Sequence, residues 1–375
     1  MCSKSNNVQV SSYIRTWPLG SKREEWTKFK YWSGKDVKGE YLTDLIISFA
    51  KINQDDWTIY LPDVDLPDSH FKNLWDEIEV IKSKTPNLRM HLSVGGWAGD
   101  GFSQMSAVPE RRAKFIKSVM EVVRARNLDG IDIDWEYPVG PDWGELPIAS
   151  TPEDGKNYIT LLTELREAFN EYEKETGKYI MLSSAIPANP WYVKKIDASK
   201  VASCVDSLKL MSYDYFGVWT EHTGHHAGLY LNPENKDKNN WSTDQAVKMF
   251  IKAGVPAEKI IVGLAFYGRA WKGVPDGGTH GFGQTFKEPA YPDGISWPDI
   301  QKLLEPGSGY TRYWDDVAKV PYLYNGDLFI TYVDQDAVAE VGKYVSENNL
   351  GGAMVWEYGH DPDCKLFKIL RESVK

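Results

Sequence analysis

Short apolar segments alternate with longer amphipathic segments along most of the chain. The short segments are rich in β-branched residues and predict buried strands at Val8–Ile14, Asp44–Ala50, Leu88–Val94, Gly130–Glu136, Tyr179–Ala185, Ser207–Tyr213, Ile260–Phe266 and Gly351–Trp356. The longer segments have apolar residues at helical spacing and predict helices that include Phe71–Lys82, Glu110–Arg126, Glu153–Glu175, Thr243–Ala253 and Ala337–Glu347. Eight strands that alternate with helices indicate parallel β/α units, so we expect a (β/α)8 TIM barrel, with an open doubly wound sheet as the alternative.

The connection between the seventh and eighth predicted strands is longer than one helix requires. Residues 267–332 are rich in Gly, Pro, Trp and Tyr and contain the strand-like runs Tyr322–Tyr324 and Leu328–Tyr332. We expect a small α+β insertion there, on the rim at the carboxyl ends of the strands, and a barrel formed by residues 8–266 and 333–375. Long ordered insertions are usually functional, and barrel active sites lie on this rim.

The fourth predicted strand carries a row of acidic residues, Asp132, Asp134 and Glu136, which we call the acid file. Because side chains alternate between the faces of a strand, Asp132, Asp134 and Glu136 share one face, while Ile131, Ile133 and Trp135 share the other. In a barrel the apolar set packs outward against the helices and the acids point into the lumen. Carboxylates spaced about 6.5–7 Å apart along a buried strand raise one another's proton affinity, so at least one is expected to hold a proton near neutral pH.

A protonated acid beside an ionised one is the arrangement that glycosidic cleavage requires. Glu136 lies last in the file, nearest the rim, and is the predicted proton donor. Two other interpretations are a divalent-metal site and a solvated acidic strand edge. A metal site normally recruits ligands from other segments as well, and an exposed edge does not interleave large apolar residues so strictly, so both are disfavoured.

Composition narrows the class of ligand. The chain has 375 residues, of which 42% are hydrophobic and 26% are charged, as in an ordinary globular protein. The formal net charge of −10 argues against nucleic acid as the main partner. No run approaches the roughly 20 apolar residues that a membrane span needs. The 15 Trp and 21 Tyr residues suit a protein that stacks on a long, uncharged ligand built of rings.

The cysteines and the first residues give information about the cellular compartment of the protein. Cys2, Cys204 and Cys364 are far apart and odd in number, so they indicate neither a disulfide framework nor a zinc site. The first residues contain no apolar run typical of a signal peptide. Cys2 lies close enough to the start to be the lipid-anchored first residue of a mature lipoprotein, although an incidental terminal cysteine is the favoured interpretation.

Five motifs together resemble one known family. The run Asp129–Glu136 matches the DxxDxDxE signature of glycoside hydrolase family 18, the chitinases. Four further segments resemble the motifs that end strands 3, 6, 7 and 8 of that family: Ser93–Trp97, Met211–Asp214, Phe266–Arg269 and Gly351–Trp356. The resemblance spans Tyr13 to Trp356, and the insertion is similar to that of the bacterial deep-cleft subfamily.

The resemblance implies a substrate-assisted retaining mechanism on chitin and chito-oligosaccharides, in which the 2-acetamido carbonyl of the sugar attacks its own anomeric carbon. By the same resemblance, Glu136 is the proton donor and later the base. Asp134 holds the acetamido N–H, and Asp132 tunes Asp134 by sharing a proton. Asp129, of opposite parity, is expected to support the strand end. From the residues alone, Asp134 could instead attack the sugar as a nucleophile.

Other motif residues are expected to bind substrate. Tyr213 lies in step with Met211 and Lys209, so its hydroxyl can face the lumen and act in catalysis beside the acids. Trp356 is expected to form the floor beneath the sugar ring. The remaining candidates for substrate binding are Asp214, Tyr13, Met211, Tyr267, Arg269 and three tryptophans on rim loops, Trp97, Trp143 and Trp219, for which core packing is an equal alternative. The histidines 222, 225 and 226 are interpreted as loop residues rather than a zinc site.

The predicted function is therefore hydrolysis of β-1,4-linked N-acetylglucosamine polymers, without a metal or organic cofactor, by a secreted or cell-surface monomer. A chitin-binding lectin on the same fold and an endo-β-N-acetylglucosaminidase acting on glycans are the alternatives. Lectins of this kind typically lack the proton donor, whereas Glu136 is present here. The chitinase-like insertion counts against the glycan-processing enzyme.

Overall fold

The computed structural model describes residues 8–17, 32–67, 69–141, 144–238 and 240–374. Its central element is a ring of parallel strands, in the order β1 (Gln9–Arg15), β2 (Asp44–Ile52), β4 (Arg89–Gly95), β5 (Gly130–Asp134), β6 (Met181–Pro187), β7 (Ser207–Met211), β8 (Ile260–Ala265) and β14 (Gly352–Trp356). Strand β1 pairs with both β2 and β14, which closes the ring. The predicted (β/α)8 barrel is confirmed, and the open-sheet alternative is wrong.

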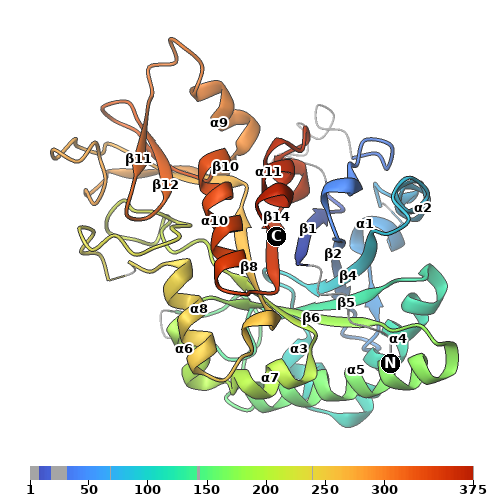
Figure 1. Cartoon of the computed structure of the whole chain (residues 1–375). Coiled ribbons are helices and arrows are strands. Elements are labelled where there is room, and N and C mark those ends of the chain that lie inside the picture. The colour runs from blue at the N-terminus through green and yellow to red at the C-terminus, as the bar shows by residue number, and fades with distance from the viewer. Residues whose placement is uncertain (1–7, 18–31, 68, 142–143, 239, 375) are drawn as a thin grey trace.

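Helices surround the barrel (Figure 1). They are α1 (Pro62–Asp65), α2 (Leu74–Lys84), α3 (Phe102–Ser106), α4 (Pro109–Arg126), α5 (Asp154–Thr176), α6 (Pro190–Lys195), α7 (Ala198–Cys204), α8 (Thr243–Lys252), α10 (Gln335–Glu347) and α11 (Lys365–Ser373). Short 3-10 turns lie at η2 (Gly39–Tyr41), η3 (Ala257–Lys259) and η4 (Tyr358–His360), and β3 (Ile59–Tyr60) pairs antiparallel with β2. No helix of the described residues is long and apolar enough to cross a membrane.

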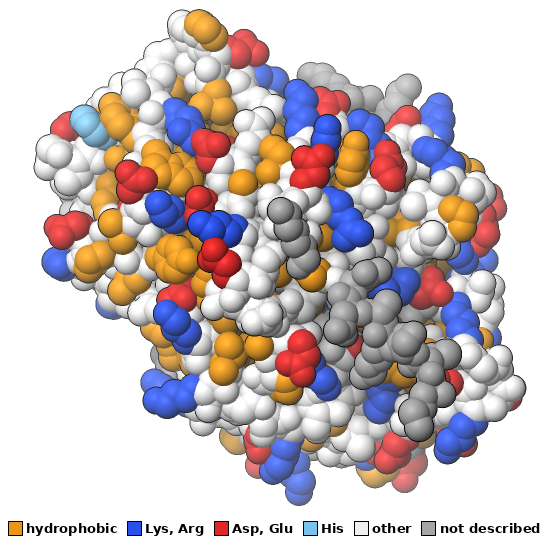
Figure 2. All heavy atoms as spheres, viewed as in Figure 1, with side chains coloured by type: hydrophobic (Ala, Val, Ile, Leu, Met, Phe, Trp, Pro, Cys, Tyr) orange, Lys and Arg blue, Asp and Glu red, His pale blue; other side chains and the backbone are white. Residues whose placement is uncertain are grey.

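A second, antiparallel sheet follows directly from β8. Its strand order is β10 (Glu288–Ser296), β9 (Tyr267–Lys272), β13 (Phe329–Thr331), β12 (Val320–Tyr324) and β11 (Thr311–Asp315), with α9 (Trp297–Leu303) between β10 and β11. All of these elements lie within the range predicted for the insertion. Figure 1 shows this sheet beside one end of the barrel, and Figure 2 shows hydrophobic side chains gathered on the surface over the same region.

The predicted strands agree with the observed ones to within two residues, but two of them end two residues early. Strand β5 ends at Asp134 rather than Glu136, and β7 ends at Met211 rather than Tyr213. The neighbouring strand β4 stops pairing with β5 at Gly95, where Gly95 and Gly96 take φ angles of 118° and 77°. Because the partner backbone turns away there, the ladder of hydrogen bonds cannot continue past Asp134.

The acid strand nevertheless keeps its alternation. Trp135 is 1% exposed and its ring lies 5.1 Å from Phe102 of α3 and 6.0 Å from Tyr158 of α5, so it packs outward. Asp132 on the opposite face is fully buried inside the barrel. The predicted division of the strand into an outward apolar face and an inward acidic face is confirmed for these residues.

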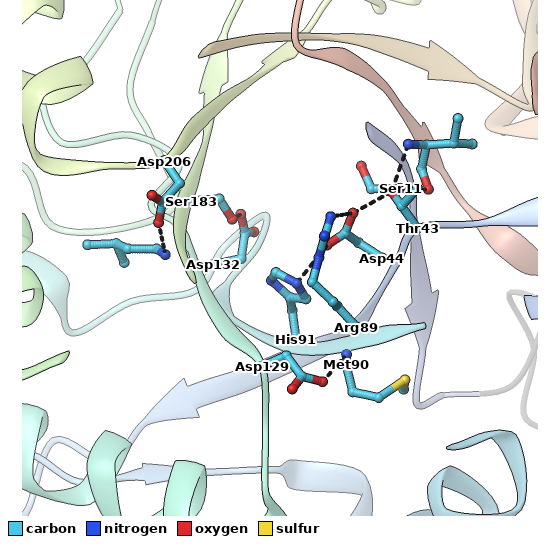
Figure 3. Close-up of polar contacts among 12 residues, drawn as sticks. Ser11, Thr43, Asp44, Arg89, Met90, His91, Asp129, Asp132, Ser183 and Asp206 are labelled. Carbon is cyan, nitrogen blue, oxygen red and sulfur yellow. Dashed lines mark hydrogen bonds and ion pairs between the residues drawn. The ribbon is translucent and has the colours of Figure 1, made fainter. Parts of the chain in front are cut away.

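The amino-terminal end of the barrel contains a buried charge cluster. Asp44 begins β2, Arg89 begins β4, and the Arg89 guanidinium contacts the Asp44 carboxylate at 2.6 and 2.7 Å. His91 Nε2 lies 2.9 Å from Asp44 Oδ1. Figure 3 shows Arg89 and His91 pointing at Asp44 within the ring of strands. Burial works to raise the pKa of Asp44, but hydrogen bonding to His91 and the charge of Arg89 outweigh burial and hold that pKa well below its usual range.

Replacing Asp44 with asparagine is expected to lower the free energy of unfolding by about 2–4 kcal/mol, because it leaves Arg89 without its carboxylate. The Arg89 side chain is 34% exposed, so the loss falls short of that of a fully buried pair. Since the folded-state pKa is depressed, this stabilisation is present above about pH 4 and is lost as the pH falls further. Urea unfolding at pH 7 and pH 3 measures both effects. The exposed control D363N should change stability by less than about 0.5 kcal/mol, and an equal effect of both variants would contradict the assignment.

Candidate active site

The site lies where β5 ends, at the carboxyl-terminal edge of the barrel. Asp132, Asp134 and Glu136 follow one another toward this edge, the first two buried and Glu136 half-buried. Gly95 of β4 lies so close to β5 that a Cβ atom there would be 2.0 Å from the Asp134 carbonyl oxygen. The two glycines after Val94 therefore allow β4 to approach the acid strand without a clash.

Asp132 is the deepest acid and is held by hydrogen bonds from four strands. It accepts from the Tyr13 hydroxyl at 2.8 Å, Ser93 Oγ at 2.8 Å, Ser183 Oγ at 2.6 Å and Lys209 Nζ at 3.1 Å. Burial works to raise the pKa of Asp132, but the Lys209 charge and the three hydroxyl groups outweigh it and keep that pKa below its usual value. Of the three acids, Asp132 is therefore the one whose surroundings favour the charged form.

Asp134 and Glu136 are shifted the other way. Burial, Glu136 and Asp132 together raise the pKa of Asp134 well above its usual value. Burial raises the pKa of Glu136 to about 7, and nearby Asp214 adds to the rise, while Tyr137 and Lys51 oppose it. Asp134 Oδ1 is buried and has no hydrogen-bond partner among the described residues. The expectation that the file holds a proton near neutral pH agrees with these directions.

Asp214 is fixed by residues of the second sheet. It accepts from the Tyr267 hydroxyl at 2.8 Å and from two nitrogens of Arg269 at 2.8 Å each, and His226 Nδ1 lies 3.5 Å away. Burial works to raise the pKa of Asp214, but His226 and Arg269 hold it well below its usual range. Asp214 has a left-handed φ of 57°, so its carboxylate is aimed by its partners rather than by strand geometry.

An aromatic cluster lies beside the acids. The Trp356 ring lies 5.6 Å from Phe49, nearly parallel to it, and 5.7 Å from Tyr13. Tyr213 packs against Gly263, and its ring lies 6.3 Å from Tyr267. Burial, Tyr267 and Asp134 raise the pKa of Tyr213 well above its usual value, so the hydroxyl keeps its proton and can donate a hydrogen bond. Met211 packs in the same lumen cluster as Tyr13, Phe49 and Trp356.

The tryptophans predicted on rim loops differ in what the structure places around them. Trp219 is 53% exposed and the Arg269 guanidinium lies 5.5 Å from its ring, which links it to the Asp214 network. Trp97 is 57% exposed and follows Gly96 at the end of β4. Core packing is therefore wrong for both residues. Trp143 lies outside the described residues, as does Cys2.

Other expectations concern residues outside the acid file. Asp129 accepts from the Met90 backbone N–H at 2.9 Å and pairs with Lys178 at 3.0 Å, so it supports the strand end as predicted. Each loop histidine faces a different aspartate: His222 faces Asp237, His225 faces Asp315 and His226 faces Asp214. Within the described ranges, no three His, Cys, Asp or Glu side chains are arranged to hold a metal ion.

Two lysines near the acids were not among the predicted site residues. The alternation with Met211 predicts that Lys209 faces the lumen. Its ion pair with Asp132 could not be predicted, because the two residues lie on strands that are distant in sequence. Lys51 donates to the Gly95 carbonyl and its ammonium lies 5.3 Å from the Phe49 ring. Ile46 of β2 faces the lumen, so simple alternation predicts that residues 48 and 50 face it as well. The register of β2 shifts between Ile47 and Ala50, and residues 49 and 51 face the lumen instead.

A closed barrel that presents a proton-holding carboxyl pair at its carboxyl edge is the arrangement of a glycoside hydrolase. Residues 13–361 match the family described as glycosyl hydrolases family 18, and the chain belongs to this family. The predicted family is thereby confirmed.

The chain is also similar to individual proteins and to solved structures. Chitinase A1 of Niallia circulans is 34% identical over 345 residues, which cover 86% of this chain and 49% of that protein. A probable endochitinase of Caenorhabditis elegans is 31% identical over 375 residues, which cover 96% of this chain and 58% of that protein. The solved structure of a family 18 N-acetylglucosaminidase from Paenibacillus barengoltzii has a TM-score of 0.82 at 32% identity, with 98% of this chain and 100% of that chain covered. The chain thus spans about half of the first two relatives.

Proposed function

We propose that this chain hydrolyses β-1,4 linkages between N-acetylglucosamine units of chitin and chito-oligosaccharides, with retention of configuration. The observation that carries the proposal is the adjacent pair Asp134 and Glu136, both with raised pKa values, at the carboxyl edge of a family 18 barrel. The names of the two chitinase relatives support the same substrate.

The proposed reaction has two steps. Glu136 donates its proton to the glycosidic oxygen as the bond to the anomeric carbon breaks, and the acetamido carbonyl oxygen of the same sugar bonds to that carbon. The Glu136 carboxylate then removes a proton from water, whose oxygen displaces the acetamido oxygen and restores the first configuration. Asp134 accepts the acetamido N–H through its buried, unpartnered oxygen, which orients the carbonyl for attack.

Neighbouring side chains are proposed to complete the sugar subsite. The Tyr213 hydroxyl donates to the acetamido oxygen, and Trp356 provides a flat face beneath the ring. Tyr13 supports Asp132 through its hydroxyl, and Met211 lines the floor. Asp214, Tyr267, Arg269, Trp97, Trp143 and Trp219 are proposed to bind the sugars that flank the cleaved bond.

The second sheet is proposed to form a wall of the substrate cleft, with residues 267–332 as an insertion in a barrel of residues 8–266 and 333–375. Support comes from Tyr267 and Arg269 of β9, which reach Asp214 at the edge of the barrel. A chitin polymer cannot enter a cell, so we also propose that the protein acts as a secreted or cell-surface monomer. Cell fractionation and sedimentation test location and oligomeric state.

The direct test is incubation of the purified protein with chitotriose and chitohexaose. Turnover that releases N-acetylglucosamine or chitobiose supports the proposal, and binding without turnover from pH 4 to pH 8 would favour a lectin. Release of intact glycans from a glycoprotein would instead favour an endo-β-N-acetylglucosaminidase. The full-length match to an N-acetylglucosaminidase structure favours a second candidate, release of single sugars from a chain end. A time course on chitohexaose distinguishes end-wise release from internal cleavage.

The pH profile is expected to report Glu136. Its carboxyl donates a proton only when protonated, so kcat/KM should fall as the pH rises through about 7, by about tenfold per unit beyond that value. Measurement with a chromogenic chitobioside from pH 4 to pH 9 locates this basic limb. A limb below pH 5.5 would mean that the donor has an ordinary carboxyl pKa, and the role of Glu136 would be wrong.

A further inference from the structure

A buried lysine lies beneath the acid file. Lys209 comes from β7, its side chain is 2% exposed, and its ammonium lies 3.1 Å from Asp132 Oδ1. The ammonium also donates to Ser183 of β6, whose own hydroxyl donates to Asp132. Figure 3 shows Ser183 beside Asp132. A lysine buried this deeply must be compensated, and Asp132 is the carboxylate that compensates it.

The ion pair of Lys209 and Asp132 affects how protons are distributed among the three acids. Every hydrogen bond that Asp132 makes with the described residues comes from a donor, since Tyr13, Ser93 and Ser183 each direct a hydroxyl at it, in addition to the Lys209 ammonium. A carboxylate accepts four such bonds, whereas a protonated carboxyl would have to donate its own proton into this shell. Asp134 has no comparable shell, because its buried Oδ1 lacks a hydrogen-bond partner among the described residues.

From this arrangement we propose that Lys209 is a positioning residue that keeps Asp132 ionised, so that the proton of the Asp132–Asp134 pair resides on Asp134. The lumen then contains one balanced ion pair and a neutral acid next to Glu136, rather than two adjacent carboxylates. The inference rests on the proposed function, because its consequence is that Asp134 enters the reaction protonated. It replaces the expectation that Asp132 and Asp134 share the proton.

Other titratable groups also act on Asp132 or Asp134. Among the described residues they are Tyr13 from β1, Lys51 from β2, Glu136, Tyr213 and Tyr158 from α5. Strands β2, β8 and β14 contribute the apolar side chains Ile46, Ile261 and Met354. Asp44 and His91 lie at the amino-terminal end of the barrel and are paired with each other. Among the described residues, Lys209 is thus the cation in contact with Asp132, whereas Lys51 acts on Asp134 and Glu136.

Replacing Lys209 with methionine tests the proposal through the pH profile. Loss of a cation in direct contact raises a carboxyl pKa by about one to three units, so the acidic limb of kcat/KM is expected to move upward by about one pH unit. The basic limb should stay in place, because Lys51 rather than Lys209 acts on Glu136. The matched control K248M removes an exposed lysine of α8 and should leave both limbs unchanged.

A second pair of variants keeps the test informative if K209M does not fold. The double variant D132N/K209M removes both charges together, so it buries no lone charge. It should have the same acidic limb as D132N if Lys209 acts through Asp132. A folded K209M with the wild-type acidic limb would overturn the proposal, as would an equal shift in both backgrounds. Circular dichroism confirms folding.

An infrared pH titration gives a readout that does not need turnover. The band of protonated carboxyl groups near neutral pH should lose a component in D134N but not in D132N. A component lost in D132N instead would overturn the proposal. If the wild-type enzyme cleaves no chito-oligosaccharide, the proposed function fails, and the infrared result still decides where the proton resides.

Discussion

Replacing Glu136 with glutamine is expected to lower kcat by about 10²- to 10⁴-fold while leaving oligosaccharide binding nearly unchanged. The amide has the size and shape of the carboxyl but has no proton to transfer. Half-buried Glu136 is the last of the inward acids, and burial holds its proton to about pH 7. The pKa of Asp134 is also raised, but Asp134 is buried one step deeper than Glu136, so Glu136 is the acid nearer to the cleft edge.

The measurement is kcat and KM on a chromogenic chitobioside, together with the dissociation constant for chitotriose from tryptophan fluorescence. The control E110Q changes an exposed glutamate at the start of α4 and should keep wild-type kinetics. Activity of E136Q within tenfold of wild type, a loss of only about 1.4 kcal/mol, would contradict the assignment of the proton donor.

A substrate without the 2-acetamido group is expected to react at least about 10³-fold more slowly than its acetamido counterpart. The proposed nucleophile belongs to the substrate, so its removal takes away the advantage of an intramolecular attack. Asp134 cannot take over, because burial and its acidic neighbours keep it protonated, and a protonated carboxyl is a poor nucleophile.

This expectation is checked by comparing chromogenic cellobioside and chitobioside under equal conditions, with competition binding to confirm that both occupy the cleft. Efficient cleavage of the cellobioside would instead identify Asp134 as the nucleophile of an ordinary double displacement. Mass spectrometry of the quenched enzyme would then reveal a sugar bound to Asp134, which the proposed mechanism does not form.

The sequence was sufficient to predict the barrel and the inward acids. The eight apolar runs define strands because each is too short for a helix and is buried on both faces, and the parity of Asp132, Asp134 and Glu136 follows from strand geometry alone. The prediction failed where a strand ends early, as at Asp134, because the end is set by the turn of the neighbouring strand at Gly95 and Gly96.

Contacts between strands could not be read from the chain. The register shift in β2 turns Phe49 and Lys51 toward the lumen, which reverses the parity that alternation predicts. Lys209 was predicted to face inward, but Asp132 lies 77 residues away and its carboxylate completes a shell supplied by four strands. Asp214 is likewise fixed by Tyr267 and Arg269 from a different sheet.

The sequence by itself therefore determined which side chains of the acid strand enter the barrel, because local periodicity and motif spacing decide that question. Only the tertiary structure decided which of those acids carries a charge and which holds a proton. The reason is physical: a carboxyl pKa in a buried lumen depends on burial and on the nearest ammonium and hydroxyl groups, and these come from segments that meet only after the barrel closes.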